Sequence, residues 1–395
     1  MHKKAAFSAL VVASLAVFLP ELDGGSPTVR PRHAGEAIAA ETVERVSVEK
    51  QKPPPGRVVL VVIDGVRWQD VFGGADPDLA RTYLIPQREV LGVEALVPNL
   101  HRLATGEGLA YGMPQIGEAM FASGPNYVSQ PGYIEIFSER RPIDCLSNYC
   151  PKTTEPTFVD AIAEATNGSA AVISSWEVVG RAAASVPHRL VLSAGQAPGE
   201  NQSELRVNAK AAHALEMGRI AAAWPGHGEY RPDKYTREIA LEYLEARHPR
   251  FLFLGLGDTD EFAHLGDYRG YLRALHDADA TVGTLLETLE RMGDDGRNTT
   301  VLVTTDHGRE RAFMSHGGFA PESSRVWMIA GGNVRPDGPV ALPKPAHLFD
   351  VGPTVRELMG LSRGQGEGRA LVDPHHGNPS ALSLAKDPRN GARAD

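Results

Sequence analysis

Acidic residues and histidines follow three short apolar segments of the sequence, a placement that suits metal ligands. They are Asp64 after RVVLVVI (57–63), Asp260 in the GDTD that follows FLFLGL (251–256), and Asp306 and His307 after TVLVTT (300–305). Two further histidines are His264, four residues beyond Asp260, and His316, within a glycine-rich SHGG segment. Mixed carboxylate and imidazole ligands suit zinc. Three Asp and three His shared between two ions leave an open position on each ion, which is typical of a catalytic centre.

Each of these six residues has a simpler explanation when it is taken alone. An aspartate at the end of a strand is commonly a turn residue or a helix N-cap, and a single histidine is usually a surface or core residue. The joint placement of the six is what favours metal binding. Asp260 and His264 are spaced so that a helix would put both on one face.

Ser129 is the candidate nucleophile of such a centre. It precedes Pro131 and Gly132 in NYVSQPGY (126–133), and the residues 133–138 are expected to form a helix. A hydroxyl at a helix N-terminus lies where backbone N–H groups favour anions. Direct coordination to a metal ion would lower the pKa of this hydroxyl. The alternative is that Ser129 only caps the helix.

Buried strands that alternate with helices are expected to position these residues. The expected strands are 57–63, 170–174, 251–256, 300–305 and 326–330, and the clearest helices are 233–246 and 268–292. Short β-branched apolar runs of this kind predict strands buried on both faces. The order indicates an α/β fold with a mainly parallel central sheet between helical layers. Ligands of such sheets bind beyond the carboxyl ends of the strands, so Asp64, Asp260 and Asp306 are expected to converge there.

The N-terminus has the pattern of a secretory signal. Two lysines precede an apolar run of about fifteen residues, so we expect a signal peptide at 1–20, a linker at 21–56 and a secreted or periplasmic protein. The run is short for a membrane span, so no stable span is expected after signal removal. An uncleaved N-terminal anchor is the alternative.

The overall composition limits the partners and the cross-links of the chain. In 395 residues, 40 Lys and Arg stand against 49 Asp and Glu, and the net charge of −9 argues against a general binder of nucleic acid or anionic membranes. Two cysteines are too few for a disulfide scaffold. In an oxidising compartment Cys145 and Cys150 are expected to form one disulfide, with free or buried thiols as the alternative.

Four motifs resemble those of the alkaline phosphatase superfamily and occur in that family's order. They are VVLVVIDGVRW around Asp64, NYVSQPGYIEIFS around Ser129, GDTDEFAHLGDY around Asp260 and His264, and TTDHGRERAFMSHGG around Asp306, His307 and His316. The sequence is similar to the phosphodiesterase/nucleotide-pyrophosphatase and phosphoglycerate-mutase-like branches. The resemblance covers 57–373, which we interpret as an alkaline-phosphatase-like catalytic domain, and we expect a flexible tail at 374–395.

The resemblance implies a metal centre, a nucleophile and a reaction. The implied ligand sets are Asp260, His264 and His316 for one divalent ion and Asp64, Asp306 and His307 for the other. Zinc is expected, with Mn or Mg as alternatives. Ser129 would coordinate metal, attack phosphorus and form a covalent phosphoseryl intermediate, and Asn126 would hydrogen-bond a non-bridging phosphate oxygen. The implied protein is an exported two-metal hydrolase of phosphate mono- or diesters with a small-molecule substrate.

The sequence departs from the family's pattern at two points, and two other functions are compatible with it. Tyr133 stands where the sulfatase motif Cys/Ser-x-Pro-x-Arg has arginine, so sulfatase activity is not expected. The interval 140–235 must supply core elements, so the large inserted domain of the mutase branch is not expected either. The alternatives are a phosphotransferase or mutase with the same intermediate, and a non-catalytic metal-containing binding module.

Six further residues are candidates for substrate contacts, and each is also explained by an ordinary surface or core position. Arg140, Arg141, Lys152 and Arg309 could bind substrate charge, and Trp68 and Tyr133 could line the pocket.

Overall fold

Three buried strands form the middle of a seven-stranded sheet: β7 (Thr299–Thr304), β1 (Arg57–Ile63) and β6 (Phe251–Leu256). Nearly every residue of these strands is buried. Both faces of the strands are therefore covered, which explains why their sequences are continuous apolar runs without alternation.

The computed structural model describes residues 56–114, 119–318, 320–334 and 344–372, and all of them belong to one compact unit, Lys52–Asp395. The predicted signal peptide and tail, and the predicted linker apart from its last residue, lie outside the described residues. Among the helices that are described, none is both long enough and apolar enough to cross a bilayer.

The sheet is mainly parallel, as the sequence predicts. Its order is β2-β9-β7-β1-β6-β4-β5, with β2 (Leu109–Tyr111), β9 (Met328–Gly332), β4 (Ala170–Ser174) and β5 (Val191–Ala194). The strands β7, β1, β6, β4 and β5 run parallel, and β9 is antiparallel to both of its neighbours. A small second sheet has the order β10 (Ala346–His347), β3 (Met120–Phe121) and β8 (Arg325–Val326).

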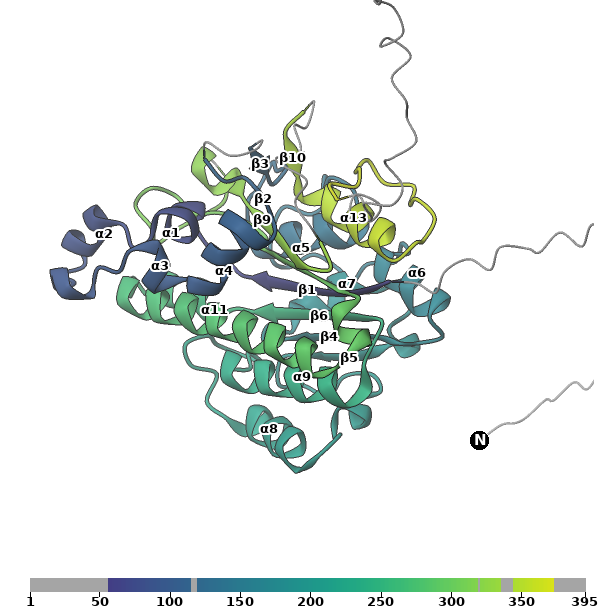
Figure 1. The fold of residues 1–395 in the computed structure, drawn as a ribbon. Coiled ribbons are helices and arrows are strands. Elements are labelled where there is room, and N and C mark those ends of the chain that lie inside the picture. The colour runs from purple at the N-terminus through teal and green to yellow at the C-terminus, as the bar shows by residue number, and fades with distance from the viewer. Residues whose placement is uncertain (1–55, 115–118, 319, 335–343, 373–395) are drawn as a thin grey trace, which may run out of the picture. The chain divides into compact units, whose positions relative to one another are not determined.

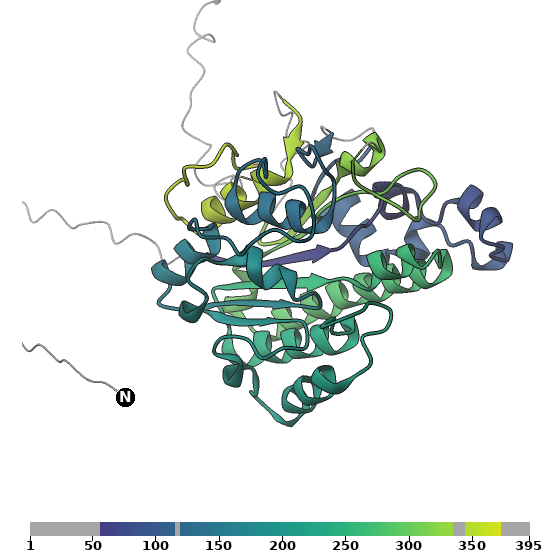
Figure 2. The same ribbon diagram turned by 180° about the vertical axis from the view of Figure 1, so that it is seen from behind.

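Helices cover both faces of the central sheet (Figures 1 and 2). The helices are α1 (Trp68–Gly73), α2 (Pro77–Thr82), α3 (Val93–Leu96), α4 (Pro98–Arg102), α5 (Ser129–Ser138), α6 (Phe158–Ala165), α7 (Val178–Ala183), α8 (Ala209–Ile220), α9 (Asp233–Arg247), α10 (Asp258–His264), α11 (Tyr268–Arg291), α12 (Asp294–Arg297) and α13 (Val351–Leu358). Val59 and Val61 of β1 pack in one hydrophobic cluster with α9 and α11. Leu60 and Val62 pack in a second cluster with α5 and α13. The predicted α/β fold with helical layers on both faces is confirmed.

The pairing register aligns the carboxyl ends of the three central strands. Ile63 of β1 pairs with Leu256 of β6, and Val62 pairs with Thr304 of β7. The backbone N–H of Asp64 then donates to the carbonyl of Leu256 (2.9 Å). The residues that follow the three strands therefore start at one edge of the sheet, where ligands of parallel sheets bind.

Candidate metal centre and active site

The turns that follow β1, β6 and β7 are hydrogen-bonded to one another. The N–H of Gly65 donates to Asp306 Oδ1 (3.0 Å), and the hydroxyl of Thr259 donates to the carbonyl of Asp64 (2.6 Å). Gly65 has a positive φ of 61°, and a Cβ there would collide with the carboxylate of Asp260. Glycine at position 65 thus permits the backbone turn and lets the carboxylates of Asp260 and Asp306 lie close to it.

Asp64, Asp306 and His307 form the first group of potential metal ligands. One ligand atom from each of the three lies within 4.8 Å of the others, and all three side chains are buried. Nε2 of His307 is 3.4 Å from Asp64 Oδ1 and 3.4 Å from Asp306 Oδ2. Its Nδ1 lies 2.8 Å from the carbonyl of Gly308. That second contact orients the ring so that Nε2 faces the carboxylates, as is usual for metal-binding histidines.

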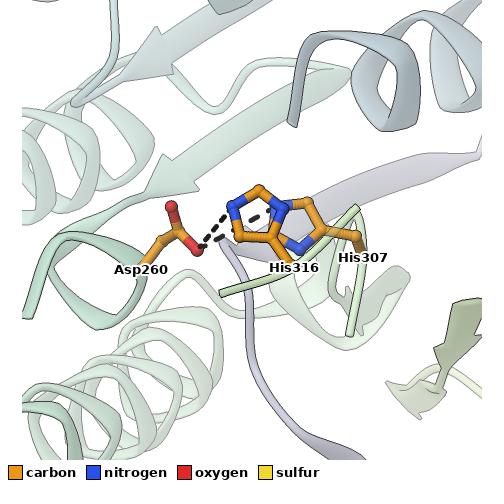
Figure 3. Close-up of side chains that lie close together, drawn as sticks. All are labelled: Asp260, His307 and His316. Atoms are coloured by element: carbon orange, nitrogen blue, oxygen red, sulfur yellow. Dashed lines mark ion pairs between the residues drawn. The ribbon is translucent and has the colours of Figure 1, made fainter. Parts of the chain in front are cut away.

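Asp260, His264 and His316 lie beside the first group. His264 Nε2 is 3.0 Å from Asp260 Oδ2 and 3.0 Å from His316 Nε2. Figure 3 shows the Asp260 carboxylate directed at both His316 and His307, whose rings stack with centroids 3.9 Å apart. The group whose ligand atoms all lie within 4.8 Å of one another here is Asp260, His307 and His316, with His307 in the place of the predicted His264. His307 therefore borders both groups, a sharing that the spacing of the sequence did not indicate.

The electrostatics of the first group favour a bound cation. Burial and then the charge of Asp260 raise the pKa of Asp64 well above its ordinary value, and burial and the charge of Asp64 do the same to the pKa of Asp306. Oδ2 of Asp306 is buried without a hydrogen-bond partner among the described residues. Carboxylates crowded in this way are stabilised by a divalent ion, and the mixed oxygen and nitrogen donors fit zinc.

Asp260 differs from the other two carboxylates because it pairs with Arg309. Burial opposes ionisation of Asp260, but the charges of Arg309 and His316 hold its pKa well below the ordinary value. The hydrogen bond with Asp260 raises the pKa of His264. Arg309, a candidate for binding substrate, is instead buried, and donates to Asp260 and to the carbonyls of Phe313 and Met314.

Ser129 is brought to the same cluster by helix α5, of which it is the first residue. Its Oγ lies 3.1 Å from His307 Nε2 and 3.3 Å from Asp64 Oδ1, and the side chain is 4% exposed. Gly132 allows this approach, because a Cβ there would collide with the carbonyl of Asp306. One hydroxyl thus reaches the ligands of the candidate centre from a helix N-terminus.

Comparisons with known proteins match the part of the chain that contains most of these residues to metalloenzymes. The model of the family described as "Metalloenzyme superfamily" matches residues 230–363, which include five of the six predicted ligands. The 2,3-bisphosphoglycerate-independent phosphoglycerate mutase of Rippkaea orientalis is 28% identical over 148 residues, 35% of this chain and 27% of the mutase. The same mutase of Haloarcula marismortui is 27% identical over 135 residues, 32% of this chain and 24% of the mutase. The matches thus span about a quarter of the length of these relatives.

Solved structures share the fold at low sequence identity. A putative sulfatase from Bacteroides thetaiotaomicron has a TM-score of 0.55 and 14% identity, over 80% of this chain and 74% of that one. The phosphonate monoester hydrolase of Agrobacterium radiobacter has a TM-score of 0.52 and 13% identity, over 82% of this chain and 78% of that one. The family-model match and the mutase relatives support a metalloenzyme related to the alkaline phosphatase superfamily, and the solved structures share the fold.

A cavity of about 450 Å³ opens beside Ser129. Its wall includes Asn148, Tyr149, Trp176 and Arg181, none of which the sequence pointed to. Asn148 and Tyr149 lie on a loop, Trp176 precedes α7 and Arg181 lies in the last turn of α7, all outside the four motifs of the sequence analysis. The closeness of Cys145 and Cys150 is the one signal that could have directed attention to the loop.

The other candidates for substrate contacts lie elsewhere or are held by protein groups. Arg140 donates to the carbonyl of Gln365, Arg141 pairs with Glu367 (3.2 Å), and Trp68 lies under the guanidinium of Arg325. Lys152 is exposed.

Two further candidates make defined contacts near the cluster. Tyr133 is buried and donates to Asp64 Oδ2 (3.1 Å). The amide of Asn126 donates to the carbonyl of Leu146 (2.6 Å) and accepts from the N–H of Gly318. A contact of Asn126 with substrate stays a prediction.

Proposed function

We propose that this protein is an exported hydrolase of phosphate esters that uses two divalent metal ions and Ser129 as the nucleophile. The observation that carries the proposal is the position of Ser129 Oγ, at the N-terminus of α5 and within 3.3 Å of both Asp64 and His307. A structural cap would need no such neighbours, whereas a nucleophile activated by metal would.

The six ligands divide between two ions in this proposal. Asp260, His264 and His316 would hold one ion and Asp64, Asp306 and His307 the other, with zinc as the expected metal and Mn or Mg as alternatives. When bound, the two ions supply the positive charge that stabilises a transferring phosphoryl group and lowers the pKa of a coordinated hydroxyl. The orphaned oxygen of Asp306 supports this assignment.

The reaction that follows has two displacements. Ser129 loses its proton to solvent, its Oγ forms a bond to phosphorus, and the bond from phosphorus to the ester oxygen breaks, so that this oxygen takes up a proton from solvent and leaves as an alcohol. Water then loses a proton to solvent and forms a bond to phosphorus, the bond to Oγ breaks, and Oγ takes up a proton, which restores the serine. A monoester releases phosphate and a diester releases a monoester. The N-terminal end of α5, where the helix dipole is positive, is suited to the negative charge of the phosphoryl oxygens.

Sulfate esters fit this chain less well, although a structural neighbour is described as a putative sulfatase. That likeness shows the fold alone. Tyr133 occupies the place of the arginine in the sulfatase motif, and its hydroxyl donates to Asp64. A phosphotransferase is the second candidate, because the curated relatives are mutases. A non-catalytic binding module would have no use for Ser129 among intact ligands.

Export is the remaining part of the proposal. It rests on the signal-like residues 1–20 and on the disulfide between Cys145 and Cys150, which is formed in the structure as predicted.

The testing experiment measures turnover of 4-nitrophenyl phosphate, bis-4-nitrophenyl phosphate and 4-nitrophenyl sulfate by zinc-loaded wild type and Ser129→Ala. We expect turnover of at least one phosphate ester, and its loss in the variant. Acid-quenched wild type should carry one phosphoryl group on Ser129 by mass spectrometry. An added alcohol that takes most of the phosphoryl group would favour the transferase. No turnover of either phosphate ester would refute the hydrolase, and full activity of Ser129→Ala would refute the nucleophile.

A further inference from the structure

The loop 145–150, closed by the Cys145–Cys150 disulfide, is hydrogen-bonded to the residue next to the proposed nucleophile. Gln130 Nε2 donates to the carbonyl of Cys150 (2.9 Å), and the N–H of Cys150 donates to Gln130 Oε1 (2.9 Å). The backbone N–H of Gln130 donates to Asn148 Oδ1 (2.9 Å). Gln130 is fully buried, so its two bonds with Cys150 are shielded from water, and the bond to Asn148 is partly buried.

The bond from Gln130 N–H to Asn148 Oδ1 supplies an N-terminal cap that the sequence of α5 itself lacks. The first N–H groups of a helix have no partner within the helix, and a side chain at the N-cap usually accepts from one of them. The N-cap residue of α5 is Val128, whose side chain has no acceptor. Asn148 supplies the missing acceptor from another segment. It therefore fixes the first turn of α5, on which Ser129 lies.

Two further contacts place the loop within the site. Asn126 donates to the carbonyl of Leu146 (2.6 Å) and accepts from Gly318, two residues beyond the predicted ligand His316. Asn148 and Tyr149 line the cavity beside Ser129. The loop is thus linked to both the nucleophile helix and a ligand segment, and it faces the space that a substrate would fill.

We propose that the disulfide-closed loop 145–150 is a positioning element for catalysis, in which Asn148 caps α5 from outside and so aligns Ser129 with phosphorus. The proposal rests on the proposed function of Ser129. The disulfide keeps the loop in the conformation that presents Asn148 to the helix, because it restricts the alternatives open to a short segment. Asn148 is a positioning residue, acting through α5.

The test compares Asn148→Ala with Asn148→Asp, which keeps an acceptor oxygen at a helix N-terminus. Small misplacements of a reacting group cost rate steeply, so kcat of Asn148→Ala should fall about ten-fold or more, with two ions retained. Asn148→Asp should recover most of the loss in kcat. The double variant Cys145→Ser/Cys150→Ser should show a similar fall in kcat. Elemental analysis on each variant measures the bound zinc.

Asn208→Ala is the matched control, because Asn208 caps helix α8 through Ala211 N–H. It removes a cap of the same kind away from Ser129, so kcat should stay within about two-fold of wild type, although some stability is lost. Unchanged kcat in Asn148→Ala would overturn the proposal. So would a loss of zinc equal to the loss of rate, or no recovery in Asn148→Asp, because either result indicates a purely structural loop.

Hydrogen exchange separates this proposal from the proposed function. The amide of Gln130 should be protected in wild type and should exchange faster in Asn148→Ala, whichever ester is the substrate. If wild type hydrolyses neither phosphate ester, the proposed function fails, and the exchange at Gln130 still decides whether Asn148 holds α5. Equal protection of this amide in both proteins would overturn the capping role.

Discussion

The buried side chain of Arg309 offers a test of the acidic cluster that does not depend on turnover. Its guanidinium pairs with Asp260 and donates to the carbonyls of Phe313 (2.7 Å) and Met314 (3.0 Å). Replacement of Arg309 by methionine keeps much of the volume and removes the charge. In metal-free protein, Asp260 would then lose its permanently charged partner and keep only its contacts with histidines, and two carbonyls would lose a donor.

The expected magnitude follows from these contacts. Removal of one partner of a buried ion pair costs about 3–5 kcal/mol, because the remaining charge stays desolvated. For a large domain each kcal/mol changes Tm by about 2 °C, so chelator-treated Arg309→Met should unfold about 6–10 °C below wild type. A divalent ion bound beside Asp260 supplies positive charge in place of Arg309. The difference in Tm should therefore shrink when zinc is added.

Thermal unfolding followed by circular dichroism measures this effect, with EDTA or with excess zinc. Arg311→Met is the matched control, because Arg311 lies in the same segment but is exposed, and its Tm should equal that of wild type. A chelator-treated Arg309→Met that unfolds within about 2 °C of wild type would refute the reasoning. A loss of Tm that zinc leaves unchanged would show that Asp260 does not face the metal.

Three further predictions concern the ligands, the nucleophile and a buried acid. Ser129→Ala should keep both ions by elemental analysis but lose about a thousand-fold or more in kcat, on the order of 4 kcal/mol. His264→Ala and His316→Ala should each lose about one ion per chain in equilibrium dialysis, and Asp306→Ala should lose the other; two ions held tightly in both histidine variants would contradict the assignment. Burial raises the pKa of Glu135 from 4.5 to about 8. The protonated Glu135 therefore stabilises the fold fully below pH 4.5, and this stabilisation is lost as the pH rises through 8. In urea unfolding, the free energy of unfolding of wild type should fall between about pH 5 and about pH 9, and that of Glu135→Gln should fall less.

Much of the fold could be predicted because its central strands are buried on both faces. Such a strand is a continuous apolar run, which can be recognised without knowing the strands that pair with it, as at 57–63 and 251–256. The helices α9 and α11 begin at the predicted residues and end within one residue of the prediction. The convergence of Asp64 and Asp306 then follows from the parallel register, which is a general property of such sheets.

Short strands and long-range pairs gave no comparable signal. The strands β3, β8 and β10 have two residues each, and their pairing joins segments that are far apart in the sequence. The position of Arg309 depends on a turn 49 residues earlier in the chain, so its burial could not be read from the neighbouring residues. The sharing of His307 between two ligand groups depends in the same way on side-chain directions.

The reaction class is easier to infer than the substrate, because the catalytic residues lie in recognisable sequence motifs and the residues of the cavity wall do not. Ser129 lies at a helix start, and Asp64, Asp306 and His307 lie just after strands, where residue type and spacing carry the chemistry. The wall of the cavity comes from loops such as 145–150, and two of the three bonds between this loop and Gln130 use backbone groups that any residue has. Hydrogen bonds made by backbone groups do not depend on the residue type, so they cannot be predicted from the sequence. The residues that select the leaving group therefore have to be sought in this cavity wall, with Tyr149 and Arg181 among the first to substitute.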